Sequence, residues 1–196
     1  MKKIFLTLII LTIGFSTKII ADNSTEIKSI FDGGKNSKIK IIVYESLTCS
    51  HCADFHNKTY PLLKENFIDN GLATIEFRSF PLDLAALNAS KIAHCRNDGK
   101  PDILHYLFKN QNKWTKGNTI EEINKNLKNV INNGNYNFNF EKCISDAKVE
   151  KYILEERING HNKYKINATP TMIILEEKFE KPLTYKNLKK YLEKLI

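Results

Sequence analysis

The sequence predicts an α/β fold in which an all-helical insertion separates a β-α-β half from a β-β-α half. Three observations carry this prediction. Residues 38–82 hold two strand-like runs around one helical pattern, residues 83–165 hold no strand-like run, and residues 166–196 show strand character followed by an amphipathic helix. A chain of 196 residues fits one domain that carries an insertion.

The first 21 residues have the features of a secretory signal. Two lysines precede an apolar run of 12 residues at 4–15, which is too short to span a bilayer at about 1.5 Å per residue. We expect residues 1–21 to be a signal peptide cleaved after Ala21, and the chain to be exported to the periplasm, where disulfides persist. An uncleaved membrane anchor is the alternative.

The first half of the fold follows a polar stretch at 22–37, which we expect to be an N-terminal arm with one short helical turn around residues 27–30. The β-branched run at 38–45 predicts a strand inside a sheet. The next pattern is helical and ends at a glycine, and Pro61 is expected to kink that helix. Alternation at 73–80 predicts the second strand.

The insertion is predicted to be a run of helices. The first covers residues 85–96, and the others are expected to begin at Pro101, at the capping box Thr119-Ile120-Glu121-Glu122, around Cys143 and at Val149. In the closing half, we expect a strand at 171–175, a brief strand around Phe179, and a final helix carrying Leu188, Tyr191, Leu192 and Leu195.

The charge balance says little about partners. The net charge is +8, but 27 of the 30 basic residues are Lys, and Lys, Asn and Ile together are typical of an AT-rich genome. Proteins that bind phosphates usually concentrate Arg. Loss of residues 1–21 removes three Lys and no acid, which lowers the net charge to +5. We therefore expect no nucleic-acid partner.

Cys49-Ser50-His51-Cys52 lies where the first strand passes into the first helix. A cysteine at a helix N-terminus faces unpaired backbone N–H groups, which lower its pKa. Cys52 lies one turn further in, within disulfide reach. We expect Cys49 to be the attacking thiolate and Cys52 the resolving thiol. His51 is expected to donate charge or a hydrogen bond to Cys49.

Two other interpretations of this pair are a static disulfide and half of a zinc site. The further zinc ligands available are His51, His56, His94 and Cys95, but no second CxxC or HxxxH pair completes a tetrahedral set. We expect no metal and no organic cofactor. We expect His94 and His105 to be packing or surface residues.

By its position alone, Pro170 is a residue that starts a strand. The element order, Cys49-Ser50-His51-Cys52 after Glu45-Ser46-Leu47-Thr48, and Ala168-Thr169-Pro170-Thr171 before an apolar strand resemble the DsbA family of thiol-disulfide oxidoreductases, which have a thioredoxin fold. The resemblance covers almost all of the chain after the signal.

The resemblance implies roles for four residues. Pro170 becomes a cis-proline that faces the active site, and Thr169 presents backbone groups to an extended substrate chain. Ser50 is placed on the same substrate face, although the family usually has proline there, which leaves the redox potential open. Relatives bury an acid near the motif, and Glu45 is the candidate here.

Cys95 and Cys143 both fall in the insertion. Pairing them leaves no unpaired thiol in an oxidising compartment and stabilises the fold by about 4 kcal/mol, whereas two free buried thiols are the alternative. Members of the family from alphaproteobacteria are similar in having a second, structural disulfide in the helical domain.

The leading prediction is a periplasmic oxidase that introduces disulfides into reduced exported proteins through Cys49 and Cys52. The resemblance implies a DsbB-type membrane quinone reductase as its reoxidant, and we expect a monomer. One alternative is a disulfide isomerase or reductase with the same fold. Another is a chaperone-like binder of unfolded exported proteins without enzymatic activity.

Overall fold

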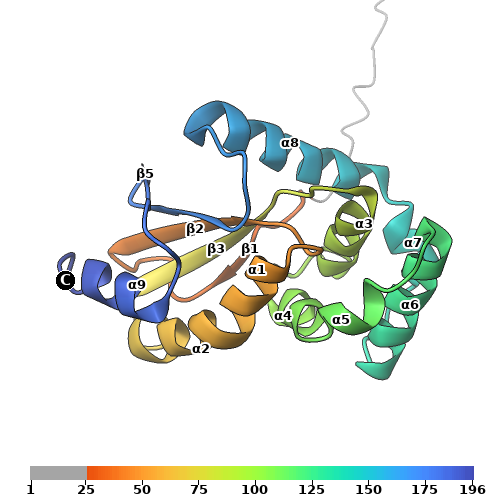
Figure 1. Ribbon diagram of the computed structural model, residues 1–196, viewed down its shortest axis with the longest axis horizontal. Coiled ribbons are helices and arrows are strands. Elements are labelled where there is room, and N and C mark those ends of the chain that lie inside the picture. Colours follow the sequence, from red (N-terminus) through yellow and green to blue (C-terminus); the bar gives the residue numbers. More distant parts are fainter. Residues whose placement is uncertain (1–25) are drawn as a thin grey trace, which may run out of the picture.

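The computed structural model describes residues 26–196, so the expected signal peptide and its cleavage site after Ala21 lie outside the described residues. Figure 1 shows the arrangement of the elements. In chain order they are β1 (Ile30–Asp32), β2 (Ile39–Glu45), α1 (Ser50–Asp54), the π-helical turn η1 (Phe55–Thr59), α2 (Tyr60–Leu63), the π-helical turn η2 (Lys64–Ile68), β3 (Ala73–Ser79), α3 (Leu84–Ala93), α4 (Asp102–Lys109), α5 (Gln111–Trp114), α6 (Ile120–Asn133), α7 (Phe140–Ile144), α8 (Ala147–Tyr164), β4 (Thr171–Ile174), β5 (Glu177–Lys178) and α9 (Tyr185–Leu192). The predicted α/β fold with a helical insertion is confirmed.

The strands form one sheet in the order β1-β3-β2-β4-β5. β2 is parallel to β3 and antiparallel to β4, which places it in the middle. Its β-branched residues suit this position because both faces of a central strand are covered. In Figure 1, α1, α2 and α9 lie on one face of the sheet, α8 crosses the other face, and α3 to α7 gather beside the sheet.

The helical turn expected around residues 27–30 is wrong. Ile30 begins β1, which pairs antiparallel with β3 and sets Ile30 opposite Phe77. The physical reason is that β3 would otherwise have an open edge. A strand added there forms hydrogen bonds with the backbone N–H and C=O groups of β3, whereas a single isolated helical turn is unstable and leaves them unpaired. The arm therefore contributes a fifth strand to the sheet.

The helix that follows the cysteine motif is not one regular α-helix kinked at Pro61. It passes through η1, α2 and η2 without a break, and Pro61 lies at the start of α2 directly after η1, where its missing N–H interrupts the hydrogen-bond ladder of the helix. π-helical turns inside a helix are often found at functional sites. The η1 turn begins three residues after Cys52 and carries His56.

Side-chain caps fix the helix starts in the second half of the chain. Asp83 caps α3 and Thr119 caps α6, while Asp146 caps α8 and starts it two residues before the expected Val149. The short helix α5 was not expected from the sequence. The last strand covers Glu177–Lys178 and ends just before Phe179.

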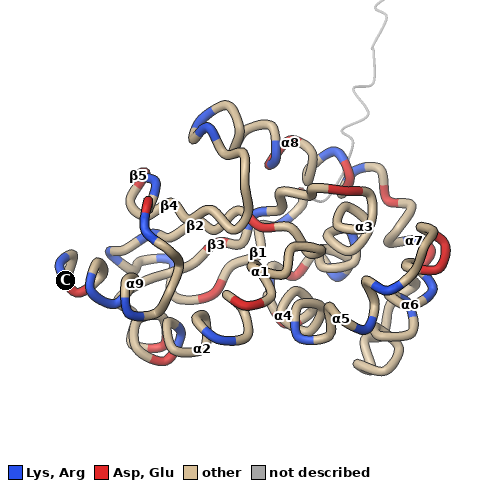
Figure 2. Tube along the Cα trace, viewed as in Figure 1, with Lys and Arg blue, Asp and Glu red and all other residues tan. Residues whose placement is uncertain are grey.

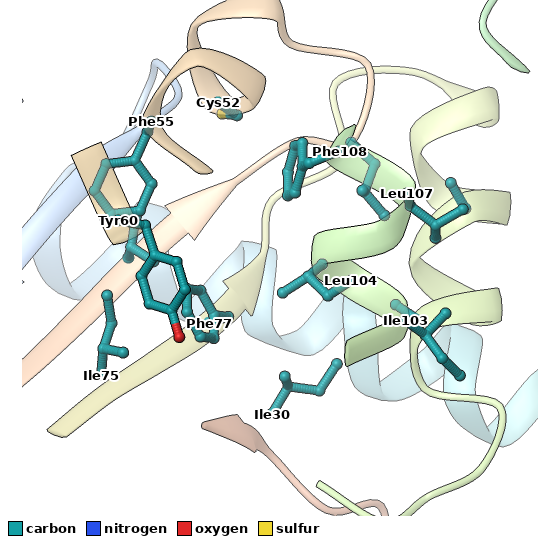
Figure 3. Close-up of a cluster of buried hydrophobic side chains, with 14 of the residues drawn as sticks. Ile30, Cys52, Phe55, Tyr60, Ile75, Phe77, Ile103, Leu104, Leu107 and Phe108 are labelled. Atoms are coloured by element: carbon teal, nitrogen blue, oxygen red, sulfur yellow. The ribbon is translucent and has the colours of Figure 1, made fainter. Parts of the chain in front are cut away.

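The insertion shares its hydrophobic core with the sheet. Cys52 and Phe55 from the first half and Leu107 and Phe108 of α4 belong to one buried cluster, which Figure 3 shows extending from the sheet to α4. Charged residues of both signs are interspersed along the chain in Figure 2. Among residues 26–196, none of the helices combines the length and the apolar character that a membrane span requires.

Candidate active site

The two cysteines of the motif lie where β2 ends and α1 begins. Cys49 is the N-cap of α1, in an extended backbone conformation (φ −76°, ψ 120°), and its N–H donates to the Ser46 carbonyl over 3.0 Å. Cys52 lies in α1 and is fully buried, whereas Cys49 is partly exposed. Both sulfurs are free thiols. Within one helical turn, the Cys49 sulfur is therefore accessible and the Cys52 sulfur is buried.

The Cys49 thiol is strongly acidic. Its pKa is lowered to about 5, chiefly because the Cys52 thiol donates a hydrogen bond to it, and this outweighs the opposing effect of burial. Further contributions come from the Thr169 side chain and from the backbone N–H groups of Cys52 and His51. Cys49 is therefore a thiolate at neutral pH.

Thr169 can contact Cys49 in either protonation state. The Cys49 thiol lies 3.3 Å from the Thr169 carbonyl oxygen and donates to it. The buried Thr169 hydroxyl has no hydrogen-bond partner within residues 26–196, so it is free to donate to the thiolate form of Cys49, and it contributes to the lowered pKa of Cys49. The Thr169–Pro170 peptide bond at the start of β4 is cis.

Cys52 has the opposite character. Burial raises the pKa of its thiol far above the usual value, and the hydrogen bond to Cys49 and the nearby charge of Glu45 raise it further. Burial likewise raises the pKa of Glu45 well above 4.5, and the Cys49 thiolate adds to this effect. Glu45 is the last residue of β2 and is almost fully buried. The buried acid that the resemblance implied is therefore present beside the two cysteines.

Two histidines extend the site away from the cysteines. Glu45 Oε2 lies 2.6 Å from His56 Nε2, and His56 Nδ1 lies 2.8 Å from His105 Nδ1. The sequence offered His56 only as a zinc ligand and placed His105 among packing or surface residues. The spacing of four residues between Cys52 and His56, which sets both on one helix face, was the signal that could have found His56.

Ser50 and His51 are both exposed. The backbone N–H of His51 interacts with Cys49, and among the described residues no hydrogen bond joins the His51 ring to that sulfur. A groove of about 490 Å³ lies beside the site, lined by His51 and Phe55 on one side and by Pro170 and Phe179 on the other. Ser50 is not among the residues that line this groove.

The insertion holds the loop before Cys49 in place. The Gln111 side chain on α5 donates to the carbonyls of Leu47, over 2.7 Å, and of Cys49, over 3.0 Å. On the other side, the Thr48 hydroxyl donates to the Asp83 carboxylate over 2.7 Å. Sequence reasoning missed Gln111 because nothing local marks a contact that spans 62 residues.

Cys95 and Cys143 are joined in a disulfide between the C-terminal end of α3 and α7. The bond takes Cys95 out of the candidate zinc ligands. Within residues 26–196, no group of three or more His, Cys, Asp or Glu side chains is arranged to hold a metal ion.

Comparisons with known proteins agree with this geometry. A family model described as thioredoxin matches residues 25–194. A protein of Rickettsia bellii named as a protein-disulfide oxidoreductase is 32% identical over 144 residues, which are 72% of this chain and 55% of that protein. The chain thus spans about half the length of the curated relatives it matches.

Solved structures carry the same fold. The crystal structure of alpha-DsbA1 from Wolbachia pipientis has a TM-score of 0.75 and 27% sequence identity, and the match covers 85% of this chain and 90% of that one. Chlamydia trachomatis DsbA matches with a TM-score of 0.65 and 21% identity, over 84% of this chain and 88% of that chain, and this shows the fold alone. The chain belongs to the thioredoxin family and is a DsbA-like member of it.

Proposed function

We propose that the protein is a protein-disulfide oxidoreductase that acts as an oxidase and donates a Cys49–Cys52 disulfide to reduced proteins. One observation carries the proposal. The pKa of Cys49 is lowered and that of Cys52 is raised, although the two thiols lie within one turn of the same helix. A stabilised Cys49 thiolate favours the reduced protein, and a protein that favours its reduced form is an oxidant.

The reaction takes two exchanges. A substrate thiolate attacks the Cys49 sulfur, the Cys49–Cys52 bond breaks, and Cys52 leaves and takes up a proton. A second substrate thiolate then attacks the substrate sulfur of the mixed disulfide, and Cys49 leaves as its stabilised thiolate. The substrate loses two electrons and gains a disulfide, while the protein gains those electrons. The low pKa of Cys49 drives the second exchange because it makes Cys49 a good leaving group.

The groove beside Pro170 is the expected place for the substrate chain. Backbone groups of Thr169 lie next to Cys49 and suit an extended peptide that pairs like a strand. The apolar side chains of Phe55 and Phe179 line the same groove and suit substrates that are not yet folded.

We further propose that the chain works in the periplasm after export by residues 1–21, on reduced exported proteins. A DsbB-type membrane quinone reductase is the proposed reoxidant, and the protein is proposed to act as a monomer. Fractionation of cells and labelling of Cys49 before and after loss of a membrane quinone reductase test these assignments. Accumulation of reduced Cys49 is the expected result.

The test of the activity is the oxidation of a reduced peptide that carries two cysteines. Oxidised wild type is expected to form the peptide disulfide, and Cys49→Ser and Cys52→Ser are both expected to be inactive, because neither variant has a disulfide to donate. Equal rates for wild type and Cys49→Ser contradict the enzyme and favour a chaperone-like binder. Equilibration with glutathione measures the reduction potential and so distinguishes an oxidase from a reductase. A potential at or below about −250 mV indicates a reductase.

A further inference from the structure

Three side chains, of which Glu45 and His56 are buried and His105 is half-buried, form a line that begins at the active site. Glu45 ends β2, His56 lies on η1 and His105 lies on α4. The contacts are 2.6 Å from Glu45 Oε2 to His56 Nε2 and 2.8 Å between the Nδ1 atoms of the two histidines. The two thiol exchanges and the substrate groove give no role to either histidine.

Aromatic rings fix the orientation of His56. Its ring stacks on Phe108 with centroids 4.0 Å apart, and it also contacts Phe77 and Tyr60. Both ring nitrogens are therefore committed, one to Glu45 and one to His105. A histidine with a hydrogen bond at each nitrogen can take a proton at one and release a proton at the other.

The outer end of the line reaches a surface cavity. His105 lines a cavity of about 600 Å³, and Asp32, Lys64 and Asp102 are among the other residues of its wall. His105 Nε2 makes no hydrogen bond to any residue within 26–196. This nitrogen is itself buried, so it lies just behind the wall of the cavity, and a small opening of that wall is what lets it exchange a proton with water.

The buried thiol needs such a route. Cys52 has no exposed surface and lies within an apolar cluster, yet it must gain a proton when it leaves Cys49 and lose one when it attacks. We propose that His56 and His105 form a proton relay that connects Cys52, through Glu45, to the solvent of the cavity beside α4. This proposal rests on the thiol-disulfide chemistry of the proposed function.

The protons balance at each step. In the charged state, Glu45 is a carboxylate that accepts the Nε2–H of His56, and His56 Nδ1 accepts the Nδ1–H of His105. One proton enters at His105 Nε2, and the proton in each hydrogen bond moves one place inward, which leaves Glu45 protonated. Glu45 then gives this proton to the Cys52 thiolate and is a carboxylate again, with both histidines left in the opposite tautomer until the reverse transfer resets them. Attack by the Cys52 thiol runs the same steps in reverse.

The surroundings favour a relay of neutral rings. Burial lowers the pKa of His56 and of His105 to about 3, and the proximity of the two rings adds to the lowering at His105. Lys64 also lowers the pKa of His105, while Asp32 and Asp102 oppose it. Neutral imidazoles pass a proton by exchanging tautomers, without an isolated buried charge at either ring.

The experiment follows the reactions of Cys49 and Cys52 as two successive kinetic phases. The reduced protein is mixed with a chromogenic aromatic disulfide that releases thionitrobenzoate. Cys49 attacks first and releases one equivalent, and Cys52 then attacks the mixed disulfide and releases the second equivalent together with a proton. Only the second phase uses the relay, so the first phase is an internal control for the reactivity of Cys49 and the integrity of the site.

We expect His56→Gln and His105→Gln to slow the second phase about a hundredfold, the lower end of the range for a lost proton transfer, and to leave the first phase unchanged. His94→Gln is the matched control, because His94 is also buried but lies outside the line. In His105→Ala, added imidazole is expected to restore the second phase from the cavity, which a purely structural role does not allow.

An unchanged second phase in both glutamine variants overturns the relay. Equal slowing of both phases, or failure of imidazole to restore the second phase, also overturns it, because each indicates a structural effect. The outcome is separate from the proposed function, since the phases report on Cys52 even if the protein fails to oxidise a peptide.

Discussion

The Cys49 sulfur and the Thr169 carbonyl oxygen lie 3.3 Å apart, although 120 residues separate them in the sequence. The helical insertion accounts for most of that separation, and each half of the sheet supplies one side of the site. The acidity of Cys49 therefore depends on β4 as well as on the helix that Cys49 caps.

We expect Thr169→Val to raise the pKa of Cys49 by about half a unit to one unit, the value of one hydrogen bond of about 1 kcal/mol. Valine keeps the shape of the side chain and removes the hydroxyl that can donate to the thiolate. Titration of the thiolate by ultraviolet absorbance measures the change. Thr171→Val is the control, because the Thr171 hydroxyl donates to the Ala168 carbonyl instead. Equal pKa values of Cys49 in the two variants contradict the assignment.

The stability of the reduced protein is expected to depend on pH through Cys49. Its pKa falls from 9.0 to about 5 on folding, so between these values the unfolded chain holds a proton that the folded protein has lost. Stability from this group therefore increases with pH and is lost as pH falls through the folded value.

Thermal unfolding of the reduced and oxidised forms between about pH 5 and 7 checks this dependence. We expect the midpoint of the reduced form to rise relative to the oxidised form. Reduced Cys49→Ser keeps Glu45 and both histidines but lacks the thiolate. Its unfolding midpoint should therefore not rise with pH relative to that of the oxidised wild type. The same pH dependence in wild type and variant would falsify the prediction.

The Cys95–Cys143 disulfide is expected to stabilise the fold without a direct part in thiol exchange. It links the C-terminal end of α3 to α7 within the insertion. Replacement of both cysteines by Ala should lower the free energy of unfolding by about 2–4 kcal/mol. Denaturant unfolding measures this loss, and peptide oxidation by the folded variant should stay close to wild type. A large loss of oxidation in a folded variant contradicts a bracing role.

Gly160 on α8 packs against the face of the sheet that α8 crosses. A Cβ atom at this position lies 2.5 Å from Tyr44 Cε1. Gly160→Ala is therefore expected to destabilise the protein by about 1–3 kcal/mol, although alanine normally stabilises a helix interior. Asn162→Ala, at an exposed position of the same helix, should be neutral or stabilising in the same denaturant assay. A gain in stability from Gly160→Ala contradicts the close packing of α8 on Tyr44.

The periodicity of the sequence predicted the order of the elements, and the structure confirms the fold. β2 and β3 could be found because a buried strand and a half-covered strand carry distinct patterns. β1 could not be found, because three residues carry no reliable period and the strand exists only through pairing with β3. The π-helical turns around Pro61 have no local pattern either.

The residues of the candidate site also fall into those that a local pattern marks and those that only packing brings together. The sequence located the cysteines because a short motif at a strand–helix junction is a local signal. The contact between His56 and His105 joins the helix of the motif to the insertion, and its formation depends on how α4 packs against η1. The contact of Gln111 with the loop before Cys49 has the same origin. Such contacts depend on the packing of distant elements, which periodicity does not report.

The position of Thr169 on the far side of the insertion has a consequence for a chain that is still being made. Cys49 leaves the ribosome long before Thr169 does, and until β4 pairs with β2 the first cysteine lacks the contribution of Thr169 to its acidity. The full acidity of Cys49 is therefore a property of the finished molecule. An unfolded copy presents two ordinary cysteines that other proteins can oxidise, and only a folded copy carries the fully stabilised thiolate.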